Sequence, residues 1–232
     1  SDAFKDRNHL DSEGRGIFCK RVTPIIDAVL KGEDPDDVVI NPSVYDIPAD
    51  ESALIESCIG SNILFGEIDG TVSIEAEDYS HCLHGVWGAE NIQWITDYSK
   101  EGYAGTGYVV AAPDDKKKIG DTTYGPRIGF NISFQNSGTY HVWIRMSGPS
   151  GSSDSIHVGL NGMPVTFGAN GLGIWDANVG DAWMWKDSMG SRITIEVSSS
   201  GEHQFNIWMR EDGVRVDSFI LTADSEFVPE GA

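Results

Sequence analysis

The feature that most constrains the fold of this chain is a series of short runs, rich in β-branched and aromatic residues, that begins at Thr71. Gly, Asn, Ser and Asp separate these runs, and no stretch of helical periodicity interrupts them. We expect strands at residues 72–76, 107–111, 127–134, 139–146, 155–160, 191–197, 201–209 and 215–221. About eight strands without an intervening helix predict two packed sheets, so residues 71–224 are expected to form an all-β sandwich or jelly roll.

Alternation within the runs indicates which side chains face the core. In the run 139–146, Tyr140, Val142, Ile144 and Met146 share one face, because successive side chains of a strand point to opposite sides of the sheet. The two alternating runs 193–197 and 203–208 flank the turn-forming stretch Ser198–Glu202, which predicts a β-hairpin. Trp143 and Trp208 lie within strands, and we expect both to pack in the core.

The N-terminal part of the chain follows a different pattern. Residues 1–35 are expected to be helical, because apolar residues between Ile17 and Leu30 recur at spacings of three and four and Gly32 follows the last of them. The acidic, proline-containing stretch Glu33–Asp37 leads into residues 36–70, which are expected to form a linker or irregular segment with room for one short helix at Ser52–Ile59. Residues 225–232 are expected to form a short tail. The abrupt start of the chain leads us to expect a piece of a longer protein.

Charge and cysteine content exclude several classes of partner. The chain carries 16 basic and 36 acidic residues, a net charge of −20. Such a field repels phosphate backbones and anionic lipids, so neither nucleic acid nor a membrane surface is an expected partner. Cys19, Cys58 and Cys82 match no zinc-binding spacing and allow one disulfide at most, and we expect reduced thiols. No apolar run reaches 18 residues. We expect a monomer.

Four segments, in order, resemble carbohydrate-binding modules of families 6 and 35. They are Ile74–Tyr79, Gly102–Val109, Gly138–Arg145 and Gly213–Leu221, and the resemblance covers nearly all of residues 72–222. It implies a two-sheet sandwich that binds polysaccharide, performs no catalysis, and is attached to a polysaccharide-processing enzyme. It also implies that the protein is secreted, periplasmic or displayed at the cell surface.

The resemblance further implies a structural calcium ion held by Glu75, Glu77 and Asp217. Two carboxylates separated by one residue on a strand point the same way and offer hard oxygen ligands side by side. If the first and last strands pair, Asp217 would complete the oxygen cage. The alternative is that Glu75 and Glu77 belong to a solvated strand face.

A dense group of tryptophans indicates where sugar would bind. Trp175, Trp183 and Trp185 lie within eleven positions of a Gly-, Asn- and Asp-rich stretch that is expected to turn rather than form strands. Aromatic rings can stack on the apolar face of a pyranose. The resemblance places the ligand cleft at Trp183 or Trp185, at Tyr98 or Tyr103, and at Arg215. For Trp185, core packing and ligand binding are both open.

Arg215 departs from the family 6 pattern, in which an asparagine is usual at that position. A guanidinium binds carboxylate or sulfate through two parallel hydrogen bonds, so Arg215 favours an anionic polysaccharide over plain xylan or cellulose.

Residues Asp6–Arg15 resemble the last conserved block of SGNH (GDSL-type) hydrolases, an α/β family. The resemblance implies that His9 is the remnant of a general base oriented by Asp6. The chain contains no serine nucleophile block, so it is expected to be inactive alone while its parent protein is an esterase. An incidental histidine at a solvated helix start is the alternative.

Two further functional classes compete with a binding module. In the first, the chain is itself part of an active carbohydrate esterase or glycoside hydrolase, because paired carboxylates can cleave glycosides. A purely structural or adhesive sandwich is the third class, but it would not need a cluster of loop tryptophans. The sequence favours a module that anchors an enzyme to polysaccharide and so raises the local substrate concentration.

Overall fold

The computed structural model describes residues 60–85, 88–120, 125–165, 174–176, 181–187 and 192–231, with only the backbone described at 174–176. These residues fall within one compact unit, Ala53–Ala232. Asp6, His9 and the expected helix within residues 1–35 lie outside the described residues. No helix in the described part of the chain is long and apolar enough to cross a membrane.

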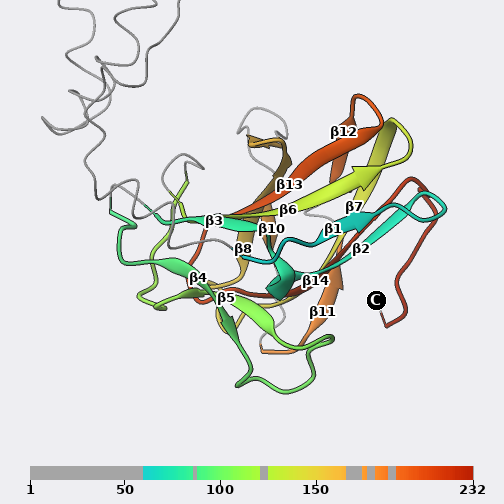
Figure 1. Ribbon diagram of the computed structural model, residues 1–232. Coiled ribbons are helices and arrows are strands. Elements are labelled where there is room, and N and C mark those ends of the chain that lie inside the picture. The colour runs from blue at the N-terminus through green and yellow to red at the C-terminus, as the bar shows by residue number, and fades with distance from the viewer. Residues whose placement is uncertain are drawn as a thin grey trace, which may run out of the picture. The chain divides into compact units, whose positions relative to one another are not determined.

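The described residues form an all-β sandwich of two seven-stranded sheets (Figure 1). The strands and one 3-10 helix are β1 (Leu64–Gly66), β2 (Thr71–Glu75), η3 (Ala76–Asp78), β3 (His81–Leu83), β4 (Gln93–Asp97), β5 (Tyr108–Ala112), β6 (Arg127–Phe134), β7 (Gly138–Ser147), β8 (Ser155–Leu160), β9 (Met163–Pro164), β10 (Ile174–Asp176), β11 (Met184–Lys186), β12 (Thr194–Val197), β13 (Gly201–Met209) and β14 (Arg215–Thr222). The all-β, two-sheet prediction is confirmed.

The two sheets differ in strand order. Sheet A runs β1-β6-β13-β8-β10, with β3 also paired to β6 and β9 to β8. Sheet B runs β11-β7-β14-β5-β4, with β12 also paired to β7 and β2 to β14. Adjacent strands are antiparallel, except that β1 runs parallel to β6. The first and last long strands therefore pair, as β2 with β14.

The core lies between the sheets and follows the predicted alternation. Tyr140, Val142, Ile144 and Met146 of β7 are buried in one apolar cluster with side chains of both sheets. Trp143 and Trp208 are only 7% and 3% exposed, but neither belongs to that cluster. Their neighbours in sequence point inward, so the two-residue period of a strand places both tryptophans on the outer faces. The expectation that both tryptophans pack in the core is therefore wrong: they are buried, but outside the core.

The predicted hairpin between residues 193 and 208 is wrong. β12 pairs with β7 in sheet B, whereas β13 pairs with β6 and β8 in sheet A. The stretch Ser198–Ser200 therefore passes from one sheet to the other. Alternation shows which face of each strand is buried, but it does not say which strand lies beside it.

Two details near the start of the sandwich differ from the sequence expectation. β1 lies at residues 64–66, inside the segment expected to be irregular, and three residues are too few to show an alternating pattern. Cys82 in β3 is disulfide-bonded, which corrects the expectation of reduced thiols. The other two cysteines, Cys19 and Cys58, lie outside the described residues.

Candidate functional site at one end of sheet B

One region of sheet B, near the start of β14, gathers most of the residues that the sequence singles out. β7 ends at Ser147 opposite Arg215, where β14 begins, and β2 ends at Glu75 opposite Ser218 of β14. β5 runs antiparallel to β14 and pairs with it at Arg215 and Val216, and Tyr108 at the start of β5 lies opposite Asp97 at the end of β4. We call this region the sheet-B end. The loop of residues 98–107, which joins β4 to β5, closes it (Figure 1).

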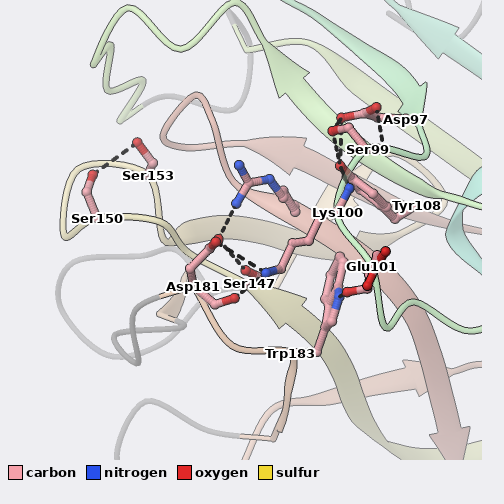
Figure 2. A network of polar contacts seen from close by, with 11 residues as sticks. Asp97, Ser99, Lys100, Glu101, Tyr108, Ser147, Ser150, Ser153, Asp181 and Trp183 are labelled. Atoms are coloured by element: carbon pink, nitrogen blue, oxygen red, sulfur yellow. Dashed lines mark hydrogen bonds and ion pairs between the residues drawn. The ribbon is translucent and has the colours of Figure 1, made fainter.

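Trp183 is held firmly at the sheet-B end (Figure 2). Its indole Nε1 donates a hydrogen bond to the carbonyl of Glu101 at 3.1 Å, and its ring meets Tyr108 edge-on with centroids 5.2 Å apart. Lys100 Nζ lies 5.6 Å from the ring centroid and the Arg145 guanidinium lies 5.7 Å from it, both within the range of cation–π attraction. The ring is half-buried, so it is a fixed wall of the site.

The two tyrosines named from the sequence lie on the same loop and differ in exposure. Tyr98 is 61% exposed, and its ring lies directly over Gly107, where an added Cβ would come within 2.9 Å of it. Tyr103 is half-buried, with its ring centroid 5.9 Å from that of Tyr108. Tyr98 is therefore the open aromatic surface of this end.

The other two tryptophans lie in short strands, not in the turning stretch expected. Trp185 is the middle residue of β11, opposite Arg145 of β7, and is half-buried. Trp175 is the middle residue of β10, opposite Ile156 of β8. The structure therefore brings Trp183 and Trp185 together on sheet B and puts the backbone of Trp175 in sheet A.

Arg215 is neutralised by an acidic residue that the sequence did not single out. Its Nη1 lies 2.5 Å from Oδ1 of Asp181, and the Oδ2 of the same carboxylate lies 3.4 Å from Lys100 Nζ (Figure 2). Asp181 is 64% exposed. Its small desolvation would raise the pKa of the Asp181 carboxyl, but Arg215 and Lys100 lower the pKa overall. Arg215 therefore shares one carboxylate with Lys100.

A second hydrogen-bonded group supports the loop from beneath. The hydroxyl of Tyr108 donates to Asp97 Oδ2 at 2.6 Å, and Ser99 Oγ donates to the same oxygen at 2.8 Å (Figure 2). The hydrogen bond from Tyr108, more than any other influence, lowers the pKa of Asp97 to about 2. Asp97 is therefore ionised throughout the physiological range.

The three residues expected to bind calcium each lie close to the backbone of the loop 98–107. Glu75 ends β2, but Glu77 lies in η3, so the expected strand spacing does not apply. Even so, a Cβ added at Gly105 would come within 3.0 Å of Glu75 Oε2 and 2.7 Å of Glu77 Oε1. The pairing of β2 with β14 brings Asp217 to them, as expected.

The charges of this carboxylate group are only partly compensated. Glu75 Oε2 and Glu77 Oε2 are buried and have no hydrogen-bond partner. Burial, together with the charges of Glu77 and Asp217, raises the pKa of Glu75 to about 7. Glu77 Oε1 accepts from the backbone N–H of Thr106 at 2.7 Å. Among the residues described, no three His, Cys, Asp or Glu side chains are arranged as a metal-binding group.

Arg145 connects the carboxylates to the aromatic wall, and sequence reasoning missed it. Its guanidinium pairs with Asp217 Oδ2, donates to the carbonyl of Gly102 at 3.0 Å, and lies against the ring of Trp183. Asp217 Oδ1 accepts from the N–H of Ala104 at 2.9 Å. Alternation in β7, which faces Ile144 and Met146 inward, was the available signal that Arg145 points outward.

This geometry suits binding better than glycoside cleavage. A pair of catalytic carboxylates needs open space between them for the glycosidic bond and, in inverting enzymes, for water. Here the backbone at Gly105 closes over Glu75 and Glu77, and an oxygen of each is buried. The exposed side chains of this region are Tyr98 and Asp181, whereas Arg215 and Lys100, which pair with Asp181, are largely buried.

The fold and this loop end define a two-sheet β-sandwich domain with an aromatic and charged group on sheet B. A sequence model of the family described as "Glycosyl hydrolase family 115 C-terminal domain" matches residues 64–229. The chain belongs to that family.

Three similar proteins illustrate its relatives. "Uncharacterized protein P23" of Formosa agariphila is 26% identical over 211 residues, which cover 76% of this chain and 49% of that protein. The chain thus spans about half the length of this relative. A family 35 carbohydrate-binding module from Clostridium thermocellum is 18% identical, with 65% of this chain and 96% of that chain covered at a TM-score of 0.46. The C-terminal family 6 module of a marine laminarinase from Zobellia galactanivorans is 20% identical, with 66% and 98% covered at a TM-score of 0.41.

Proposed function

We propose that the sandwich is a non-catalytic carbohydrate-binding module that holds an appended polysaccharide-degrading enzyme on its substrate. The observation that carries the proposal is the sheet-B end, where Trp183 is held beside Lys100 and Arg145, and where the exposed Tyr98 lies on the same loop as Lys100. A sugar ring presents C–H groups to aromatic faces and hydroxyls to charged side chains, so such a surface fits it. Membership of a family of glycosyl hydrolase C-terminal domains supports an enzyme as the attached partner.

The same proposal places the protein outside the cytoplasm, either secreted, periplasmic or at the cell surface. Polysaccharides are substrates that cells meet outside the membrane. The disulfide at Cys82 supports this, because disulfides persist in oxidising compartments. An SGNH-type esterase as the attached enzyme rests on Asp6 and His9 alone, which lie outside the described residues.

We further propose that Glu75 and Glu77 hold a calcium ion. Two buried carboxylate oxygens without partners are costly, and a hard cation with oxygen ligands removes that cost. Asp217 contributes its charge to the same group, since it is among the carboxylates that raise the pKa of Glu75. A bound calcium ion would supply the positive charge that this group lacks and would fix the loop that lies over it.

An anionic polysaccharide is the ligand class that Arg215 favours. Binding a uronate or sulfate there requires the ligand to take the place of Asp181 on the guanidinium. That exchange is inexpensive, because an ion pair to a largely exposed carboxylate contributes only about 0–1 kcal/mol. Left in place, the Arg215–Asp181 pair offers both donors and an acceptor, which matches the hydroxyls of a neutral sugar.

A screen of the full chain against immobilised neutral and anionic polysaccharides tests the proposal. We expect retardation in affinity gels by at least one polysaccharide, and loss of that retardation in Tyr98→Ala with an unchanged melting temperature. Val228→Ala, at another exposed apolar residue, is the control and should bind normally. Failure of every polysaccharide to retard the chain would refute the proposal.

A further inference from the structure

The outer face of sheet A carries a second polar group, built from strands other than those of the sheet-B end. We call it the sheet-A cluster: His81 of β3, Arg127 of β6, and Gln204, Asn206 and Trp208 of β13. Register brings them together, because Gly129 of β6 lies opposite His81 on one side and Asn206 on the other. A Cβ added at Gly129 would come within 2.6 Å of His81 Nε2 and 2.8 Å of Asn206 Nδ2. Glycine therefore leaves room for both side chains.

A directed chain of hydrogen bonds fixes the tautomer of His81. The N–H of Gly162 donates to Asn206 Oδ1 at 2.7 Å, and Asn206 Nδ2 donates to Gln204 Oε1 at 2.8 Å. The remaining amide nitrogen, Gln204 Nε2, then donates to His81 Nδ1 at 3.4 Å. Because Nδ1 is an acceptor, the ring proton lies on Nε2. Burial and the nearby charge of Arg127 lower the pKa of His81, so the ring is neutral near pH 7.

Arg127 differs from every other arginine of the described residues. The other four each pair with a carboxylate: Arg145 with Asp217, Arg192 with Asp187, Arg210 with Glu211, and Arg215 with Asp181. Arg127 forms no ion pair with any residue that the structure describes, and its Nε is buried without an acceptor. In a chain with 36 acidic and 16 basic residues, an unpaired arginine is unexpected.

The Arg127 guanidinium lies over the Trp208 ring, 5.6 Å from its centroid. Stacking occupies the face of a guanidinium and leaves its N–H edges in the plane. The Nε of Arg127 is buried, so the two Nη groups form the edge that a ligand would contact. Those edges and the proton on His81 Nε2 are all hydrogen-bond donors. A ligand group that only accepts hydrogen bonds fits them best, and a carboxylate fits the arginine fork in particular.

We propose that Arg127 and His81 form a carboxylate-binding site on the outer face of sheet A, separate from the proposed sugar site. The ligand is a carboxylate-bearing saccharide or another small carboxylate. The net charge of −20 opposes anions at long range, but at physiological salt this repulsion is screened beyond about 8 Å. Donors in direct contact with the carboxylate therefore decide binding.

Nuclear magnetic resonance of the full chain tests the site directly. The probes are sodium acetate, galacturonate and galactose, and the signals followed are Arg127 Nε–H and the His81 ring. We expect galacturonate to shift both signals in a saturable way and galactose to shift neither. Acetate distinguishes the sources: equal binding of acetate indicates a general carboxylate site, and weaker binding indicates that the sugar ring adds contacts. Absence of a shift with both carboxylates overturns the proposal.

Matched variants separate the site from general electrostatics. Arg127→Gln should weaken galacturonate binding by about tenfold or more, the effect of losing a hydrogen bond to a charged group. Arg127→Lys keeps the charge without the fork and should also weaken it, which keeps the test valid if the glutamine variant folds poorly. Arg192→Gln removes the same charge from a paired arginine and should leave affinity unchanged. Equal weakening by Arg192→Gln would refute the site.

Failure here is distinguishable from failure of the proposed function. Tyr98→Ala removes the open aromatic of the sheet-B end and should leave the Arg127 and His81 shifts intact. If Tyr98→Ala abolishes those shifts, the carboxylate binds at the sheet-B end and the sheet-A site is refuted.

Discussion

The sheet-B end and the sheet-A cluster both combine a tryptophan with an arginine, but they differ in how the arginine is satisfied. At the sheet-B end, Arg145 pairs with Asp217 and Arg215 pairs with Asp181. In the sheet-A cluster, Arg127 stacks on Trp208 and has no acidic partner among the described residues. A ligand at the first site must compete with a carboxylate of the protein, whereas a ligand at the second would meet no competing carboxylate among the described residues. The same two residue types, tryptophan and arginine, therefore predict different ligands at the two sites, and ligand binding at each should respond differently to mutation.

The largest expected effect is that of Trp183→Ala at the sheet-B end. It distinguishes a residue that supports the folded site from a residue that only contacts the ligand. Trp183→Ala should abolish polysaccharide binding and also lower stability by about 1–3 kcal/mol, less than the cost of removing a fully buried tryptophan. The reason is that Trp183 contacts Tyr108, Lys100 and Arg145 and bonds the Glu101 carbonyl. Binding assays and chemical denaturation of the same variant measure both losses. Tyr98→Ala is the matched control, with loss of binding but a stability change within about 0.5 kcal/mol. Equal stability of the two variants would contradict the distinction.

Calcium removal is the next largest effect and tests the uncompensated carboxylates of the sheet-B end. At a calcium concentration about a hundredfold above its Kd, the ion should stabilise the fold by about 2.7 kcal/mol, equivalent to about 5–10 °C in melting temperature. Glu75→Gln should eliminate that shift and raise the melting temperature of the metal-free domain, because it removes a buried charge that Glu77 and Asp217 repel.

The control for the calcium experiment is Glu202→Gln, which removes an exposed carboxylate from β13 in the other sheet. That variant should keep the full response to calcium. A melting temperature that is the same with and without a chelator would show that Glu75 and Glu77 hold no calcium.

The sequence predicted the framework of the sandwich better than its contacts. Alternation in residues 139–146 identified the four buried side chains of β7, because the period of a strand is a local property. It missed β1, β3, β10 and β11, each of three residues, which are too short to show a period, and it also missed the five-residue β4. It also assigned residues 193–208 to one sheet, since turn residues do not reveal whether a connection stays in a sheet or changes sheets.

The sequence singled out many residues of the candidate site but not their pairing. Glu75, Asp217, Trp183 and Arg215 lie in the same region of sheet B, and their roles in binding stay predictions. Asp181 was missed because its partner Lys100 lies 81 positions away in the sequence. Contacts of this range depend on tertiary packing, which no local pattern contains. Only the structure therefore shows which charged groups are already paired and which can bind a ligand.

Removing the partner of Arg215 should make the sheet-B end behave more like the sheet-A cluster. Asp181→Asn frees the guanidinium, so affinity for uronate-containing oligosaccharides should rise by up to about fivefold, the value of an exposed ion pair of about 1 kcal/mol. Arg215→Asn should weaken the same ligands by about 1.5 kcal/mol and spare neutral ones. Calorimetry with matched uronate and neutral oligosaccharides measures both. Opposite signs for the two variants support the exchange of Asp181 for ligand, and weakening by both would contradict it.

The smallest expected effect concerns Asp97, whose hydrogen bonds support the loop beneath the site. The hydrogen bond from Tyr108 lowers its pKa to about 2 in the folded state, below the ordinary aspartate value of about 3.9 in the unfolded chain. Because the folded state binds the proton less readily, Asp97 adds stability above about pH 4 and loses it as the pH falls towards 2. Asp97→Asn should therefore be less stable than the parent at pH 7, by under about 1 kcal/mol because the carboxylate is well solvated. Denaturation at pH 7, 4 and 2 should show this difference in stability shrinking as the pH falls. A difference that stays constant down to pH 2 would mean that the charge of Asp97 plays no part and that only the geometry of its hydrogen bonds matters.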